Sequence, residues 1–256
     1  MLRIRPEQMK ILEDAVWQGF EDEMADYSRE FNPVLCGVLD EGELRKALRK
    51  TIKRARGYGF TCRGPIRLCI ELMHLFGSSF DTDPQYPMFG EILKSPGHEM
   101  DRAGQLYAAV GDYLDKVSGE NGIHEGRALE RFSTVVREPI RYSPEEFEEA
   151  MVREMIRIYP QKAVLIGEEG LTVLIREGRQ EAHTYGFNTV QAEALVVRLM
   201  YGFGHGCTDD PLYPWISRTL KDEKITDPSS RAKRLEKKAL TWLDQVLERL
   251  HEGAQS

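Results

Sequence analysis

The chain has 256 residues, of which 41 % are hydrophobic and 30 % are charged, so it can fill a core without disulfides or metals. Its 42 acidic and 35 basic side chains give a net charge of −7, which argues against binding to nucleic acid or to anionic membranes. Arg3, Arg5 and Glu7 interrupt the apolar run that a secretory signal needs, and no stretch reaches the roughly 18 apolar residues of a membrane span. We therefore expect a cytoplasmic protein.

The first predicted helix runs from Pro6 to Phe31, because proline is favoured at a helix start and apolar residues then recur at three- and four-residue spacing. A second helix, with one apolar face, is predicted over Glu41–Arg56, and Gly59 is the candidate for its left-handed stop. A third helix, around residues 66–76, is apolar on almost every side, which indicates a central position.

Gly77 ends this third helix and leads into a turn rich in aspartate and proline. A short fourth helix begins near Met88, and a closing helix is predicted from about Glu99 to Val117. The first 120 residues thus form a helical unit, which the sequence then repeats.

Shifting the sequence by 127 residues aligns Phe20–Lys94 with Phe147–Lys221 without a gap, and 22 of the 75 aligned positions are identical. The shared motifs include Tyr-Gly-Phe at 58 and 185 and Asp-Pro-x-Tyr-Pro at 83 and 210. The match resumes after a two-residue insertion, where Tyr113 aligns with Trp242. The sequence therefore predicts an all-α fold of two tandem, roughly five-helix units packed pseudo-symmetrically: residues 1–120, a linker at 121–142, and residues 143–256.

The second unit is predicted to open with a capping box, in which Ser143 precedes Pro144 at the first helical position and Glu146 completes the box. Its second helix spans Glu168–His183 and stops at Gly186. The third lies around residues 194–203, the fourth begins near residue 215, and the closing helix covers residues 229–251, with residue 227 as its N-cap. Within the linker, residues 131–141 are rich in β-branched side chains and read as a strand or an extended segment.

Four cysteines, Cys36, Cys62, Cys69 and Cys207, have neither CxxC spacing nor histidines at zinc-finger distances. We read all four as reduced thiols, and Cys62 and Cys69 as buried apolar residues. No metal or cofactor is expected.

The repeated Asp-Pro corners are the most distinctive surface motif, and two interpretations compete. Asp83 and Asp210 could ligate a cation, but calcium needs several more oxygen ligands at fixed spacing. An aspartate before a proline more simply forms a turn. The structural interpretation is favoured, and metal binding is the alternative.

Two further groups of residues occur in one unit only. His205, Cys207 and Asp209 are the residue types of a nucleophile or metal site, but the first unit lacks them, which favours an ordinary loop histidine. Arg45, Arg49 and Lys53 belong to a basic run on the second helix, which is either a solvated face or a docking surface for an acidic partner.

No nucleophile elbow, phosphate-binding glycine loop, dinucleotide fingerprint or HExxH helix occurs in the sequence. We therefore predict no catalytic residues, and place any specific binding site where the two copies differ or at the repeated corners. The candidate partner-binding residues are Arg45, Arg49, Lys53, Asp83, Tyr86, His205, Asp209, Asp210, Tyr213 and Trp215.

The segment 147–215 resembles a group of uncharacterised bacterial helical proteins that accompany spike-tip (PAAR-type) and effector components of type VI secretion systems. The resemblance rests on Tyr-Pro at 159, Gly-Glu-Glu at 167, Tyr-Gly-Phe at 185 and Asp-Asp-Pro-Leu-Tyr-Pro-Trp at 209, together with the opening residues 2–9. It implies an accessory role, either as an immunity protein that blocks a toxin or as an adaptor that holds one. It supplies no catalytic residues.

The expected function is a non-catalytic scaffold that binds a protein partner, with a secreted effector or a spike component as the first candidates. The alternative is a small hydrolase or metal-dependent enzyme with its site at the repeated Asp-Pro-x-Tyr-Pro loops. Neither nucleic acid nor membrane is expected as a partner.

Overall fold

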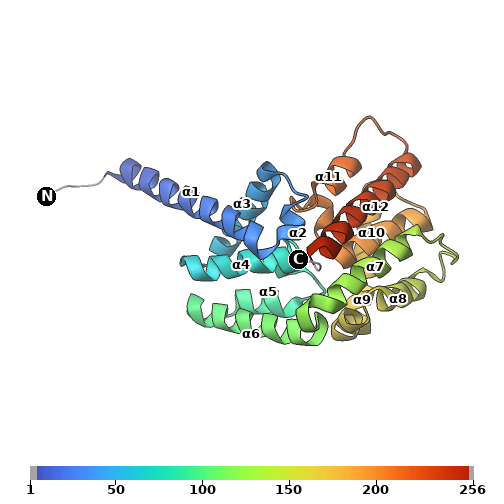
Figure 1. Ribbon diagram of the computed structural model, residues 1–256, viewed down its shortest axis with the longest axis horizontal. Helices are drawn as coiled ribbons and strands as arrows, with labels where there is room; N and C mark the ends of the chain where they lie inside the picture. The colour runs from blue at the N-terminus through green and yellow to red at the C-terminus, as the bar shows by residue number, and fades with distance from the viewer. Residues whose placement is uncertain (1–4, 254–256) are drawn as a thin grey trace.

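A computed structural model describes residues 5–253 of the chain. Within that range the fold is all-helical, with twelve α-helices, three short 3-10 turns and no strand (Figure 1). None of the helices in the described range has the length and apolar character needed to cross a membrane. Residues 2–4 of the segment 2–9 quoted for the family resemblance lie outside the described residues.

The first half of the chain, residues 5–118, contains six helices with the bounds α1 Pro6–Phe31, α2 Pro33–Cys36, α3 Glu41–Gly57, α4 Arg63–Phe76, α5 Pro87–Lys94 and α6 Glu99–Val117, and the turn η1 Phe80–Thr82. The predicted stop after α3 is confirmed: Gly59 has φ 81°, and Phe60 N donates to Ala55 O at 3.1 Å. Figure 1 shows the N-terminal part of α1 projecting away from the other helices.

The second half, residues 147–253, contains α8 Phe147–Ile158, α9 Pro160–Thr184, α10 Val190–Phe203, α11 Pro214–Leu220 and α12 Pro228–Gly253, with the turn η3 Cys207–Asp209. Adding 127 to the bounds of α4 gives 190–203, which are the bounds of α10, and the same shift converts η1 into η3. Gly167, with φ 74°, interrupts α9 where α2 and α3 are separate helices in the first half. Asp227 caps α12 as predicted, because its Oδ2 accepts from Ser230 N at 2.7 Å.

The expectation of a strand or extended linker at residues 131–141 is wrong for residues 131–137, which are helical, whereas residues 138–141 lie outside any helix. After the turn η2 Glu120–Gly122, the helix α7 spans Ile123–Arg137 and packs against both α8 and α12. Ala128, Phe132 and Val136 recur at four-residue spacing and are all buried. Burial of this apolar face outweighs the modest helix penalty of the β-branched residues, so the linker is a packed element of the fold.

The start of the second half also differs from expectation. α8 begins at Phe147 and not at Pro144, because Glu146 N bonds to Ser143 O at 3.2 Å and closes a turn there. Part of the capping box nevertheless forms, since a Glu146 carboxylate oxygen accepts from Ser143 N at 2.9 Å. The first helical i to i−4 bond follows, from Ala150 N to Glu146 O.

One hydrophobic core runs through both halves, and α10, which is buried on nearly all sides, crosses its centre. All four cysteines are free thiols. Cys69 and Cys207 are buried, but the expectation that Cys62 is buried is wrong, because this residue occupies the exposed N-cap position of α4, before the helix enters the core.

Candidate functional site

The two Asp-Pro corners reach across to each other's half of the chain. Asp83 Oδ2 accepts a hydrogen bond from His205 N at 2.8 Å, and Asp210 Oδ2 accepts one from Ser78 N at 2.7 Å. Both aspartates are 2 % exposed. The two hydrogen bonds are equivalent, because a shift of 127 residues aligns Ser78 with His205 and Asp83 with Asp210. In each bond the aspartate of one half accepts from a backbone amide of the other half. We call these four residues the Asp clasp.

The remaining carboxylate oxygens of the clasp are also occupied. Asp83 Oδ1 accepts from Gln85 N at 2.9 Å, and Asp210 Oδ1 accepts from Leu212 N at 3.0 Å. Burial raises the pKa of Asp210, and the hydrogen bonds from Leu212 and Ser78 oppose this rise. Both carboxylates therefore hold backbone amides, and among the described residues no group of three or more His, Cys, Asp or Glu side chains is arranged to hold a metal ion.

Two glycines bring the ends of α4 and α10 into contact beside the clasp. Gly77 has φ 89° and Gly204 has φ 92°, a region that side-chain-bearing residues rarely adopt. A Cβ atom at Gly77 would lie 2.8 Å from Phe203 O, and one at Gly204 would lie 2.7 Å from Phe76 O. The two helix ends can meet this closely only because both residues are glycine.

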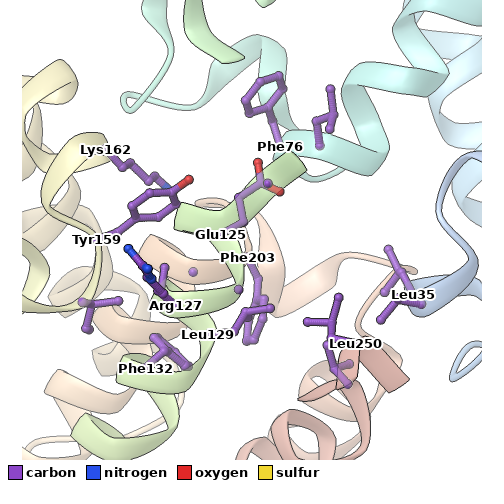
Figure 2. A pocket seen from close by; sticks show the side chains of 18 of the residues that line it. Leu35, Phe76, Glu125, Arg127, Leu129, Phe132, Tyr159, Lys162, Phe203 and Leu250 are labelled. Carbon is purple, nitrogen blue, oxygen red and sulfur yellow. The ribbon is translucent and has the colours of Figure 1, made fainter. Parts of the chain in front are cut away.

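A cavity of about 590 Å³ adjoins this contact, and its walls come from both halves and from α7 (Figure 2). Figure 2 shows Lys162 and Tyr159 on one side of this central cavity and Leu35 and Leu250 on the other. The rim includes Glu125 and other exposed residues of α7. The cavity has the size and the mainly apolar walls of a ligand pocket.

Lys162 lies at the floor of the central cavity and is 5 % exposed. Its Nζ donates to Tyr201 O at 2.6 Å and lies 4.6 Å and 5.4 Å from the ring centroids of Tyr201 and Tyr86. Burial lowers the pKa of Lys162 to about 8, and the negative charges of Asp83 and Glu125 oppose this effect. An ammonium group has three N–H donors, and this one has a single hydrogen-bond acceptor.

His74, at the end of α4, is the second buried polar group in the cavity wall. It is 6 % exposed, and neither ring nitrogen has a hydrogen-bond partner. Burial lowers the pKa of His74 to about 4, so its imidazole is neutral at pH 7. The aligned residue of the second half, Tyr201, satisfies its hydroxyl by donating to Tyr159 O at 3.0 Å.

His74 predicts a specific acid sensitivity. In the unfolded chain His74 takes up a proton near its ordinary pKa of 6.5, whereas in the folded chain burial lowers its pKa to about 4. The folded state therefore loses stability as the pH falls from about 6.5 to about 4. We expect His74→Leu to flatten the dependence of the unfolding free energy on pH between 7 and 4 by up to about 3 kcal/mol. Urea titrations at each pH measure this. The exposed His251→Gln serves as control and should leave the slope unchanged; a wild-type slope in His74→Leu would refute the prediction.

The candidate residues at the Asp-Pro corners divide between the clasp and the cavity. Asp83 and Asp210 form the clasp, while Tyr86 and Tyr213 line the central cavity. Trp215 is half-buried and lies beside Phe203, with ring centroids 6.2 Å apart. The corners thus join the two halves and supply part of the cavity wall.

The basic run on α3 is largely neutralised within the molecule. Arg45 bonds to Asp22 at 2.6 Å and to Glu41 at 2.6 Å, and Arg49 bonds to Glu21 at 2.8 Å. Lys53 is exposed. These pairs leave less free positive charge for an acidic partner than the sequence suggested.

His205, Cys207 and Asp209 do not converge on one point. His205 Nε2 lies 3.0 Å from Thr82 Oγ1, whereas the exposed Asp209 pairs with Lys221 at 2.7 Å. Cys207 is fully buried, and burial raises the pKa of its thiol, so it is not an activated nucleophile.

Sequence reasoning did not identify Lys162, His74 or the α7 side of the cavity as candidate site residues. A usable signal existed in the alignment of the halves, where Leu35 corresponds to Lys162 and His74 to Tyr201. No protein-family model, curated protein or solved structure matches the chain. The interpretation of the cavity therefore depends on its own geometry.

Proposed function

We propose that the chain is a non-catalytic interaction scaffold, built from two tandem helical units with approximate twofold pseudo-symmetry, and that a protein partner docks over the rim of the central cavity. The reciprocal bonds of the Asp clasp and the common helix bounds at an offset of 127 residues support the pseudo-symmetric arrangement. The docking of a protein partner is argued from the composition of the cavity rim.

The rim combines half-buried apolar side chains with exposed charged ones. Val34, Leu129 and Leu250 line the cavity and are only partly buried, and Arg127, Glu130 and His251 stand exposed among them. An apolar centre ringed by polar groups is the usual anatomy of a protein interface. The rim also draws on both units and on α7, so a partner bound there would contact elements that only the folded chain brings together.

The first partner to test is an effector or a spike component of a type VI secretion system, because the sequence resembles proteins that accompany them. The protein would act in the cytoplasm as an immunity protein or as an effector adaptor and chaperone. Deleting the gene distinguishes these roles: loss of an immunity protein kills the cell, whereas loss of an adaptor stops delivery of the effector.

Substituting the rim tests the docking surface. We expect Leu129→Glu or Leu250→Glu to weaken binding to the effector or spike protein at least about tenfold, because each places a charge in a contact that becomes dry on docking. Val164→Glu, on α9 and 81 % exposed before substitution, is the matched control and should bind as the wild type does. Titration calorimetry with purified partners measures the affinities.

Two outcomes would count against the proposal in different ways. Wild-type affinity in both rim variants would show that the partner docks elsewhere on the protein. Failure of the wild-type protein to bind any effector or spike component would remove the secretion system as the source of the partner.

A further inference from the structure

The floor of the central cavity contains a buried cation whose hydrogen-bonding capacity is not filled. Lys162 Nζ has one hydrogen-bond acceptor, whereas the buried carboxylate of Asp83 accepts three hydrogen bonds, from Gln85 N, Gln85 Nε2 and His205 N. Buried charges in proteins are normally paired or fully hydrogen-bonded. The Lys162 ammonium is therefore the group that lacks hydrogen-bond acceptors, and a negatively charged acceptor complements it.

A purely structural role for Lys162 is to cap the last turn of α10 through Tyr201 O. The first half of the chain indicates that this cap is dispensable. Its α4 has the same bounds as α10 after the 127-residue shift, yet the residue aligned with Lys162 is the apolar Leu35. The helix α4 thus ends without a lysine at the equivalent position. Helix capping therefore does not explain why residue 162 is charged.

The other groups of the floor define what kind of molecule fits. Phe76, Phe203 and Phe132 supply aromatic walls, and His74 offers one neutral, unpartnered donor and acceptor. Lys162 is the buried cation of this cavity, and Glu125 stands at the rim, where it would repel a second negative charge. The arrangement suits a single negative group attached to an apolar body and disfavours nucleotides or other polyanions.

We propose that the floor of the central cavity binds a small monocarboxylic acid with an apolar chain or ring, whose carboxylate pairs with Lys162 Nζ while its apolar body lies against the phenylalanine walls. This goes beyond protein docking at the rim. Lys162 and His74 are buried whereas the apolar rim residues are only partly buried, so the floor suits a small free molecule. Pairing of a carboxylate with the ammonium satisfies donors that the folded chain leaves unused.

Octanoate is the probe, and octanamide is the uncharged comparison of nearly the same shape. Trp242 lines the cavity, so its fluorescence reports binding, and titration calorimetry gives the affinity. The wild-type protein should bind octanoate at least about tenfold more tightly than octanamide. Lys162→Leu, which installs the residue that the first half has at the aligned position, should lower octanoate affinity at least about tenfold and leave octanamide affinity unchanged.

Lys237→Met removes an exposed lysine of α12 that does not line the cavity, and this variant should bind octanoate as the wild type does. A thermal melt followed by circular dichroism establishes that Lys162→Leu is folded, and Lys162→Met provides a second variant that keeps more of the lysine's length. Both are expected to fold, because replacing a buried charge by an apolar side chain of similar size is often neutral or stabilising.

Three results would overturn the proposal: no saturable binding of octanoate to the wild-type protein, equal affinities for octanoate and octanamide, or unchanged octanoate affinity in the folded Lys162 variants. A protein partner that loses affinity on Lys162→Leu, in a protein that does not bind octanoate, would assign the floor to the protein partner instead. The rim variants Leu129→Glu and Leu250→Glu test protein docking separately.

Discussion

Asp210→Ala is expected to lower the free energy of unfolding by about 3 kcal/mol, which for a chain of this size corresponds to a fall of roughly 6–12 °C in the melting temperature. The alanine leaves the backbone amides of Ser78 and Leu212 buried without their acceptors. Relief of the buried charge offsets part of the loss, because burial already raises the pKa of the Asp210 carboxyl. Asp210→Asn keeps one oxygen acceptor and should lose about half as much.

Asp209→Ala is the matched control, since this aspartate is the preceding residue but is exposed and makes only a surface pair with Lys221. It should change stability by no more than about 0.5 kcal/mol. Combining Asp210→Ala with Asp83→Ala measures how strongly the two carboxylates are coupled. Equal stability of Asp209→Ala and Asp210→Ala in thermal unfolding would show that the clasp does not stabilise the fold.

Gly77→Ala is expected to lower the free energy of unfolding by about 3–5 kcal/mol. Two causes add. The backbone at residue 77, with φ 89° and ψ 159°, is strained for any residue with a side chain. In addition, the new Cβ would lie 2.8 Å from Phe203 O, a backbone atom that can move only if the end of α10 moves.

Gly167→Ala separates the two causes. Gly167 has nearly the same backbone conformation, with φ 74° and ψ 168°, but a Cβ there would have no atom within 4 Å. It should therefore lose only the strain contribution, about 1–3 kcal/mol. Urea unfolding of both variants gives the comparison, read from midpoints at an unchanged m value. Equal losses would mean that the two helix ends are not in close contact.

Both experiments bear on the candidate site, because the clasp and the glycine contact hold together the two halves that form the central cavity. Gly77 and Gly204 themselves line the cavity, and Tyr86 and Tyr213 follow the clasp aspartates by three residues. A shift of one half relative to the other would separate Lys162 from the ring of Tyr86, which lies in the other half. We therefore expect variants that weaken the clasp to weaken binding in the cavity as well.

The amino-acid sequence by itself determined most helices and several of their ends. Hydrophobic spacing predicted α1 and α6 with the observed bounds, Gly59 and Gly186 were recognised as stops, and Asp227 was recognised as a cap. These features could be predicted because each depends on residues within a few turns of one another. Residues 131–137 became helical against their local preference, since packing on α8 and α12 outweighs that preference.

Only the tertiary structure decided the features from which function is argued. The clasp bonds join residues 122 and 132 positions apart, so no local pattern could show that each aspartate serves the other half. The burial of Lys162 and His74 in one cavity likewise depends on how α4, α7, α9 and α10 are packed. Burial and long-range hydrogen bonding are properties of the whole arrangement, and the alignment of the two halves marked these positions only as places where the copies differ.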